Sequence, residues 1–245
     1  MSTRRGRVLV LTAVDAEREA VAAGLAAAGA PGGGAEVVAA GVGPAAAAAR
    51  AMHAMLTACG AGRRPGLVVS AGIGGGFAPA APVGSLAVAR TIVAADLGVR
   101  TGEGFTPVAE LGFGRGEHYP PAGLSRAVAD ALGAAYGPVL TVGTVTGTAE
   151  RAAELAARHP GAVAEGMEGF GVAEAAAQLG IPVLEIRAVS NAVGPRDRAA
   201  WRIGEALAAL TAAFGKLPGI LEVEAAHDDT DEPDEPGDTE DTGDR

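Results

Sequence analysis

The stretch Val8-Leu9-Val10-Leu11-Thr12-Ala13-Val14-Asp15-Ala16-Glu17, residues 8–17, decides the fold class. Its first four residues are apolar, with no polar residue alternating between them, which is typical of a strand covered on both faces. Alanines and acidic residues follow at once, and residues 16–28 are predicted to form a helix. A buried strand that passes directly into a helix is the unit of a parallel or mixed sheet with helices on both sides.

The same alternation continues along the chain. The other predicted strands are residues 36–40, 67–70, 85–93, 138–145, 163–164 and 183–189, and the other predicted helices are residues 45–58, 123–135, 149–158, 168–179 and 197–214. No Ser/Pro-rich linker divides this series. We therefore predict one α/β domain, residues 1–222, with a central mixed sheet flanked by helices.

The charge of the chain is concentrated at its C-terminal end. The formal net charge is −10, and residues 228–245 hold ten Asp or Glu and one Arg, so residues 1–227 carry only −1. A nearly neutral body has no bulk attraction for nucleic acid or anionic lipid, and an acidic tail repels both. The tail also lacks the apolar side chains that ordering requires. We predict a disordered tail at residues 223–245, and neither nucleic acid nor a membrane as a partner.

Cysteine and histidine usage argues against a metal. The chain has one cysteine, Cys59, and four scattered histidines, so it offers neither a Cys-based zinc site nor a histidine ligand spacing. No apolar run reaches the roughly 18 residues that span a bilayer. Asp15 and Glu17 end the first apolar stretch too early for a signal peptide. We expect a cytoplasmic protein without a metal.

One glycine-rich segment matches a cofactor motif loosely. Gly41-Val42-Gly43-Pro44-Ala45-Ala46 fits the dinucleotide pattern after a strand, but that pattern needs an acid about 20 residues further on to bind the ribose. The next acidic residue is Asp96. No Lys-Ser or Lys-Thr pair follows any glycine-rich loop either, which argues against nucleoside triphosphates. We predict that the protein uses no cofactor.

The C-terminal ends of the predicted strands are the places to look for a site. Glu17 follows the first strand, the glycines of residues 72–76 follow the third, and Glu168 and Asn191 follow two later ones. Asp15 is predicted to cap the first helix, which leaves Glu17 as either a solvated first-turn acid or a site residue. The glycines either permit a tight turn or let backbone N–H groups approach a ligand. Together these residues indicate a cleft with two carboxylates and an amide.

Four segments occur in the order found in purine nucleoside phosphorylases and nucleosidases. They are Ala13-Val14-Asp15-Ala16-Glu17, Gly72-Ile73-Gly74-Gly75-Gly76-Phe77-Ala78-Pro79, Met167-Glu168-Gly169 and Ser190-Asn191-Ala192-Val193. The chain resembles this family over roughly residues 7–215. The resemblance implies a mixed sheet partly closed into a distorted barrel and a small-molecule nucleoside as ligand. It also implies a homo-oligomer with sites near the subunit interfaces.

The resemblance assigns roles to individual residues. Glu17 falls where the nucleosidases keep the acid that activates water, and Met167 and Glu168 fall where the family contacts the ribose and its hydroxyls. Ile73 and Gly74 fall in the segment that faces the substrate. These roles suit the chemistry, because breaking an N-glycosidic bond develops positive charge on the ribose, which nearby carboxylates stabilise.

Departures from the family pattern indicate which reaction and which base this chain favours. The phosphorylases hold phosphate with a Ser or Thr at the position of Ile73, whose side chain has no donor, so hydrolysis is favoured over phosphorolysis. Asn191 stands where adenine-cleaving relatives carry Asp, and its NH₂ group suits the oxo group of hypoxanthine. Gly166 replaces a Glu of the methylthioadenosine nucleosidases. Thr148-Ala149-Glu150 lacks the aromatic residue that those enzymes place against the purine.

The sequence therefore predicts an N-ribosyl hydrolase that releases hypoxanthine from a nucleoside with a large 5′ substituent. For a carboxylate on that substituent, Arg196 and Arg198 offer charge and Trp201 an apolar wall, at a helix N-terminus capped by Asp197. The alternative is that both arginines are solvated and the tryptophan belongs to the core. Two other functions stay open: a methylthioadenosine/S-adenosylhomocysteine nucleosidase, which Asn191 disfavours, and a non-catalytic nucleoside-binding protein, which needs no water-activating acid.

Overall fold

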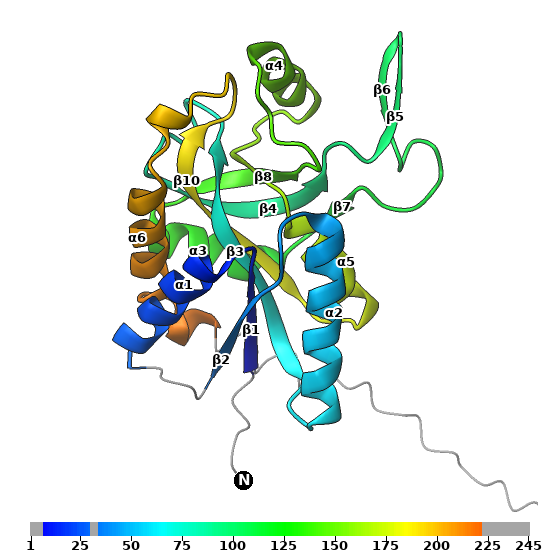
Figure 1. Ribbon diagram of the computed structural model, residues 1–245. Coiled ribbons are helices and arrows are strands. Elements are labelled where there is room, and N and C mark those ends of the chain that lie inside the picture. The colour runs from blue at the N-terminus through cyan, green and yellow to red at the C-terminus, as the bar shows by residue number, and fades with distance from the viewer. Residues whose placement is uncertain (1–6, 30–33, 222–245) are drawn as a thin grey trace, which may run out of the picture.

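The computed structural model describes residues 7–29 and 34–221 (Figure 1). The predicted tail at residues 223–245, and the domain end at residue 222, lie outside the described residues. The strands are β1 (Arg7–Thr12), β2 (Ala35–Ala39), β3 (Pro65–Gly76), β4 (Leu86–Ala94), β5 (Gly98–Thr101), β6 (Gly104–Pro107), β7 (Glu117–His118), β8 (Ala135–Thr141), β9 (Ala164–Gly166) and β10 (Val183–Ala192). The helices are α1 (Asp15–Ala27), α2 (Pro44–Gly60), α3 (Ala122–Leu132), α4 (Ala149–Arg158), α5 (Gly169–Gln178), the short 3₁₀ helix η1 (Arg198–Ala200) and α6 (Ile203–Phe214).

The main sheet is mixed and closes on itself. Its strand order is β10-β4-β8-β9-β3-β1-β2, with β7 paired to β4, and β10 also pairs with β3. The last pairing joins β3, β10, β4, β8 and β9 into a ring, while β1 and β2 extend from β3 as an open wing. The expected mixed sheet, partly closed as a barrel and flanked by helices, is therefore confirmed.

Strand β3 belongs to both parts of the sheet. On one edge it pairs with β1 over Leu67–Ser70 and then with β9 at Gly75 and Gly76. Its other edge follows β10 from Val68 to Gly76. Between the two partners on the first edge, no strand of the described part of the chain lies beside residues 71–74, so their backbone groups can form hydrogen bonds with side chains there.

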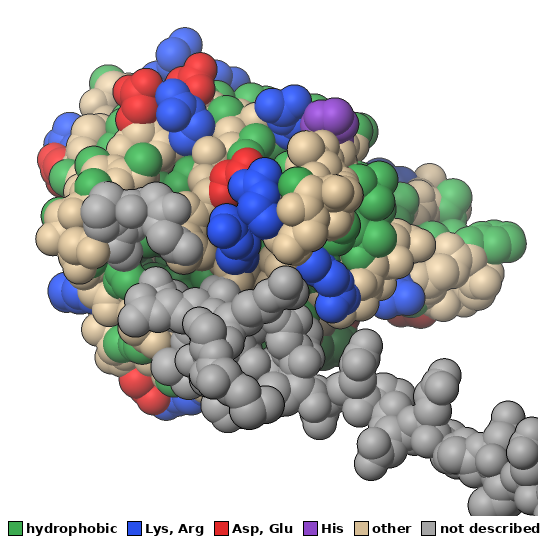
Figure 2. All heavy atoms as spheres, turned by 90° about the horizontal axis from the view of Figure 1, so that it is seen from below, with side chains coloured by type: hydrophobic (Ala, Val, Ile, Leu, Met, Phe, Trp, Pro, Cys, Tyr) green, Lys and Arg blue, Asp and Glu red, His purple; other side chains and the backbone are tan. Residues whose placement is uncertain are grey.

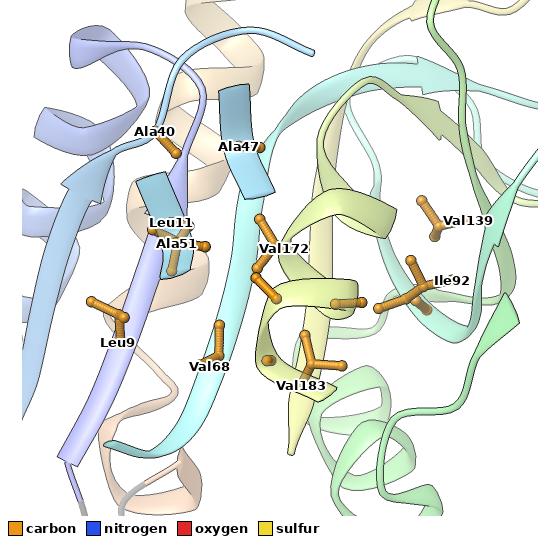
Figure 3. Packing of buried hydrophobic residues seen from close by; sticks show 14 of the residues in the cluster. Leu9, Leu11, Ala40, Ala47, Ala51, Val68, Ile92, Val139, Val172 and Val183 are labelled. Carbon is orange, nitrogen blue, oxygen red and sulfur yellow. The ribbon is translucent and has the colours of Figure 1, made fainter. Parts of the chain in front are cut away.

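Helices cover both faces of the sheet (Figure 1). Helices α1 and α6 pack together on one face with α3 near them, and α2 and α5 pack together on the other. Figure 3 shows the hydrophobic core between the sheet and helices α2 and α5, in which Val68 and Leu9 of the sheet lie beside Ala51 of α2 and Val172 of α5. Because helices cover both faces of the sheet, residues on both faces of β1 and β3 are apolar, with no polar residues alternating between them.

Several predicted boundaries were wrong. The third strand does not end at residue 70 but runs through the glycines to Gly76. The fifth predicted strand ends at Thr141 rather than residue 145, so residues 142–148 form a loop before α4. Helix α3 ends at Leu132 because Gly133 adopts a left-handed conformation with φ 59°, which stops a helix.

The hairpin of β5 and β6 was not expected. It projects away from the sheet (Figure 1) and leaves apolar side chains exposed on and near it, including Val99 and Phe113. Figure 2 shows the molecule from below, where Lys and Arg side chains occur in small groups, some with Asp or Glu beside them. Among residues 7–29 and 34–221, no helix has the length and apolar character needed to cross a membrane.

Candidate active site

A cavity of about 320 Å³ lies where β1, β3, β9 and β10 approach their carboxyl ends. It brings together seven of the nine predicted site residues, namely Glu17, Ile73, Gly74, Met167, Glu168, Asn191 and Trp201. Arg196 and Arg198 do not line it. Val14, Val42 and Val145 stand exposed at its walls, so its rim is apolar. Three carboxylates face it, and none of the described residues that line it is Lys or Arg.

Glu17 is buried, with 3% of its surface exposed, so it is not a solvated first-turn acid. Its Oε2 accepts the backbone N–H groups of Ala13 at 2.8 Å and Val14 at 3.2 Å. Its Oε1 accepts the N–H of Ile73 at 2.9 Å. The prediction that Asp15 caps α1 was wrong: the helix begins at Asp15, whose carboxylate pairs with Arg18.

The glycines of β3 serve close packing rather than a turn. The backbone N–H of Ile73 donates to Glu17. Ile73 lies in the part of β3 between its pairing with β1 and its pairing with β9, so this N–H is not used by a neighbouring strand on that edge. A Cβ on Gly72 would lie 2.8 Å from Oε1 of Glu17 and 2.9 Å from Nη1 of Arg187. A Cβ on Gly74 would lie 2.5 Å from the carbonyl oxygen of Glu165. Neither glycine has a positive φ, so the turn interpretation of this segment was wrong.

Glu168 sits at the junction of β9 and α5 and is almost fully buried. Its Oε1 accepts the N–H of Gly43 at 3.2 Å, and its Oε2 accepts Nη1 of Arg187 at 3.2 Å. These donors satisfy a charge that would otherwise be costly to bury. Met167, beside it, is half-buried and lines the same cavity.

Arg187 of β10 is a central residue that the sequence reasoning missed. It is 1% exposed, and it donates through Nε to Glu185 at 2.8 Å, through Nη1 to Glu168 and through Nη2 to Ser70 at 3.3 Å. Burial by itself would lower the pKa of Arg187, but the nearby carboxylates outweigh it and raise that pKa. The signal was present: opposite charges two residues apart in an apolar strand share a face, which indicates a buried ion pair.

Two glycines make room for this ion-pair network. A Cβ on Gly166 would lie 2.9 Å from Cζ of Arg187, and a Cβ on Gly169 would lie 2.2 Å from Oε2 of Glu185. Gly166 is the residue at which the family resemblance predicts a departure from the methylthioadenosine nucleosidases. The guanidinium of Arg187 fills the space that a side chain at residue 166 would need.

Glu165 is the second missed residue. It lines the cavity and is 4% exposed, and its Oε1 accepts the backbone N–H of Thr146 at 2.9 Å. Its Oε2 also accepts the hydroxyl of Thr146. Burial raises the pKa of the Glu165 carboxyl, against the two hydrogen bonds from Thr146, which favour its charge. A charged residue directly after the apolar pair Val163-Ala164 was the available signal.

Asn191 lies within the last residues of β10 and is half-buried. Its Oδ1 accepts the hydroxyl of Ser190 at 2.9 Å, and its Nδ2 donates to the carbonyl of Ala192 at 3.1 Å. The amide group has two N–H bonds, so one remains available for a ligand.

The predicted 5′ pocket differs from expectation. Residues 197–214 do not form one helix: Asp197 caps the short η1, and α6 begins only at Ile203. The N–H of Arg202 donates to the carbonyl of Ser190 at 2.8 Å rather than facing a ligand. Arg196 and Arg198 are exposed outside the cavity, and Cζ of Arg196 lies 5.7 Å from the ring centre of Trp201, which lines it. Among the described residues, no group of three or more His, Cys, Asp or Glu is placed to hold a metal ion.

Comparison with known proteins agrees with this architecture. The profile of the phosphorylase superfamily matches residues 14–222. A futalosine hydrolase of Streptomyces coelicolor is 62% identical over 232 residues, which cover 90% of this chain and 99% of the relative. A futalosine hydrolase of Acidothermus cellulolyticus is 43% identical and covers 89% of this chain and 91% of its own. A methylthioadenosine/S-adenosylhomocysteine nucleosidase of Colwellia psychrerythraea, solved with adenine, shares the fold with a TM-score of 0.68 at 20% identity, over 93% of this chain and 97% of its own.

Proposed function

Because this chain belongs to the phosphorylase superfamily and matches a futalosine hydrolase along most of its length, we propose that it is an N-glycosidase that hydrolyses futalosine. The observation that carries the reaction is that Glu17 and Glu168 face one cavity from different strand ends, each held by buried donors. The released base is then hypoxanthine, and the step belongs to menaquinone biosynthesis in the cytoplasm.

The two carboxylates divide the chemistry. Glu17 takes a proton from the attacking water, with its orientation fixed by the N–H groups of Ala13, Val14 and Ile73. Glu168 accepts from the ribose hydroxyls, and its negative charge favours the positive charge that develops on the sugar as the C1′–N9 bond breaks. Met167 packs under the sugar as an adaptable apolar surface.

The charge of the cavity supports water rather than phosphate as the nucleophile. The described lining residues include three Glu and no Lys or Arg, and Arg187 behind them is already paired with Glu168 and Glu185. A phosphate dianion would be repelled there, and the apolar Ile73 offers it no side-chain donor. The same negative lining stabilises a cationic sugar.

Asn191 supports a 6-oxopurine as the base. Its free amide N–H can donate to an oxo group, whereas the exocyclic NH₂ of adenine needs an acceptor. A methylthioadenosine/S-adenosylhomocysteine nucleosidase activity is the second candidate. It ranks below futalosine hydrolysis because the solved nucleosidases resemble this chain in fold alone. A nucleoside-binding protein without activity needs no carboxylate to activate water, which disfavours this alternative.

The 5′ end of futalosine carries a carboxylate, and the described residues that line the cavity include no Lys or Arg to pair with it. Arg196, beside Trp201 at the cavity wall, is the charge best placed to meet it, and Arg198 follows on η1. The exposed apolar side chains of the β5–β6 hairpin region, such as Phe113 at 79% exposure, support a homo-oligomer.

One assay tests the activity. The protein is incubated with futalosine, methylthioadenosine and inosine, with and without phosphate, and the free base is measured by chromatography. We expect hypoxanthine from futalosine at a rate that phosphate does not change. Faster release from methylthioadenosine would favour the second candidate, and phosphate dependence would indicate a phosphorylase. Light scattering after gel filtration measures the oligomeric state.

A further inference from the structure

A groove lies at the end of the sheet opposite the active-site cavity. One part of it, about 270 Å³, lies at the amino ends of β1, β2 and β3, and a second part of about 150 Å³ continues between β2 and α2. The two parts share the lining residues Glu36, Ala58 and Arg63, and we call them together the β2 groove. The active-site cavity lies at the carboxyl ends of the strands, so the proposed hydrolysis does not use this groove.

The walls of the β2 groove explain its shape. β2 is the last strand in the sheet order, so within the described part of the chain only one of its edges is paired. Helix α2 lines the groove with the small residues Ala54, Thr57 and Ala58. These side chains leave room beside the outer edge of β2, where backbone groups have no strand partner in the described residues.

The β2 groove is positively charged. Its described lining residues include Arg7, Arg50 and Arg63 and one acid, Glu36, so three positive charges less one negative charge give +2 with histidine neutral. All three arginines are exposed. The ion pairs among the described residues are formed by other arginines. Three guanidinium groups around one groove attract an anionic segment.

The C-terminal end of the same chain supplies such a segment. Residues 228–245 hold ten Asp or Glu and one Arg, a formal charge of −9. Residues 1–227 carry only −1 in total, so the body as a whole does not attract the acidic segment. A local charge of +2 does attract it at short range, and the segment has no apolar side chains that would direct it elsewhere.

The described chain ends close to the β2 groove. Leu221 is 1% exposed and belongs to the same hydrophobic cluster as Val8, which lines the groove. Asp228 comes seven residues after Leu221, and an extended chain advances about 3.3 to 3.6 Å per residue, so this link spans up to about 25 Å. The stretch of α2 from Arg50 to Gly60 is about 15 Å long, which about five extended residues cover.

We propose that residues 228–245 dock in the β2 groove of their own chain, with their carboxylates on Arg7, Arg50 and Arg63. This inference goes beyond the proposed function, because it assigns a segment and a surface that hydrolysis does not use. Each contact is an exposed ion pair and is weak, but the tether gives the segment a high effective concentration at the groove. Docking also covers the outer edge of β2, which is otherwise open to pairing with another chain.

The single cysteine allows a probe beside the groove. Cys59 is free and follows Ala58, which lines both parts of the groove, so a nitroxide spin label on its sulfur broadens the NMR signals of nearby amides. The full-length chain is labelled with ¹⁵N, and the signals of residues 228–245 are compared with the nitroxide oxidised and reduced. We expect broadening at about 0.01 M salt that is lost at about 1 M, because the Debye length falls from about 30 Å to about 3 Å.

Two variants with the same change in net charge locate the contact. The groove variant combines Arg7→Gln, Arg50→Gln and Arg63→Gln. The control combines three exposed arginines that do not line the groove, as Arg90→Gln, Arg115→Gln and Arg126→Gln. The groove variant should lower the ratio of docked to free segment about 3- to 100-fold, because each exposed ion pair contributes a factor of about 1.4 to 5. The control should keep the broadening of the wild type.

Three results would overturn the proposal. They are no broadening at low salt, an equal loss in the groove variant and the control, and broadening that arises only when the nitroxide and the isotope are on different chains. The last result would place the segment on a second copy. If the groove variant does not fold, the acidic segment is neutralised instead, with Asp228→Asn, Asp229→Asn, Asp231→Asn and Glu232→Gln. The broadening should then fall in the same way, and unchanged broadening counts against the proposal.

Discussion

Nη1 of Arg187 lies 3.2 Å from Oε2 of Glu168, and both side chains are buried. The arginine comes from the middle of β10 and the glutamate from the start of α5, so the pair ties the sheet to the residue proposed to bind ribose. The same guanidinium reaches Glu185 and Ser70 on its other sides. Arg187 and the backbone N–H of Gly43 offset the cost of burying Glu168 at the wall of the cavity.

Removing Arg187 should destabilise the protein strongly. Arg187→Met leaves Glu185 and Glu168 buried without their cation, a change that costs about 3–5 kcal/mol in comparable sites. The free energy of unfolding from urea titration measures it. Arg126→Met is the control, because Arg126 pairs with Asp130 on the surface, where such changes stay within about 0.5 kcal/mol. Similar losses in both variants would contradict the buried-network interpretation.

Adding a methyl group at Gly166 should disturb the same network. In Gly166→Ala the new Cβ meets the guanidinium of Arg187, which is held by three partners and cannot move without breaking them. We expect a loss of about 1–3 kcal/mol in unfolding free energy. Gly123→Ala on the exposed side of α3 should be neutral or slightly stabilising, because the new Cβ would have no described residue outside its own helical turn within 4 Å. An equal change in unfolding free energy in Gly166→Ala and Gly123→Ala would contradict this prediction.

Glu17→Gln should lower kcat by about 10²- to 10⁴-fold if this residue is the general base. The structure adds a second effect, because a Gln amide would turn an NH₂ group toward backbone N–H donors that now meet a carboxylate. Leaving buried donors unpaired costs about 1–3 kcal/mol of stability. The measurement is kcat on futalosine below the melting temperature of the variant, with substrate binding checked by calorimetry. A rate near that of the wild type would exclude the assignment.

Asn191→Asp should impair hypoxanthine release, because it places an acceptor against an acceptor. Unpaired buried groups cost about 1–3 kcal/mol, which corresponds to roughly a ten- to hundredfold loss in kcat/KM on futalosine. The same variant loses the donor that now reaches the carbonyl of Ala192. Steady-state kinetics with futalosine and methylthioadenosine measure both effects. Unchanged kinetics on futalosine would refute the pairing argument.

Arg196→Ala and Arg198→Ala should lower kcat/KM only for substrates that carry the 5′ carboxylate. The comparison is kcat/KM for futalosine and for inosine, which lacks the extension. A charge-assisted hydrogen bond predicts a loss of about ten- to hundredfold on futalosine alone. Because Arg196 lies against Trp201, we expect the larger effect there. Equal losses on both substrates, or none on either, would discard this role.

Much of the fold could be predicted from the sequence because the strands are buried on both faces. Residues 8–11, 85–93 and 183–189 are apolar enough to be located within one to three residues of β1, β4 and β10. The continuation of β3 through Gly76 could not be predicted, since glycine in a strand is explained only by what approaches it. At Gly72 those neighbours are Glu17 and Arg187, which lie far away in the sequence.

The sequence by itself determined the α/β class, the position of the site at the carboxyl ends of the strands, and the residues Glu17, Glu168 and Asn191 that meet there. Each follows from local information, namely which residues are apolar and which polar residue comes directly after them. Only the tertiary structure decided that Arg187 stands behind Glu168 and that Glu165 and Asn191 flank Gly75. Those relationships depend on which strands become neighbours when the sheet closes, and strand pairing is set by the packing of the whole chain rather than by any one segment.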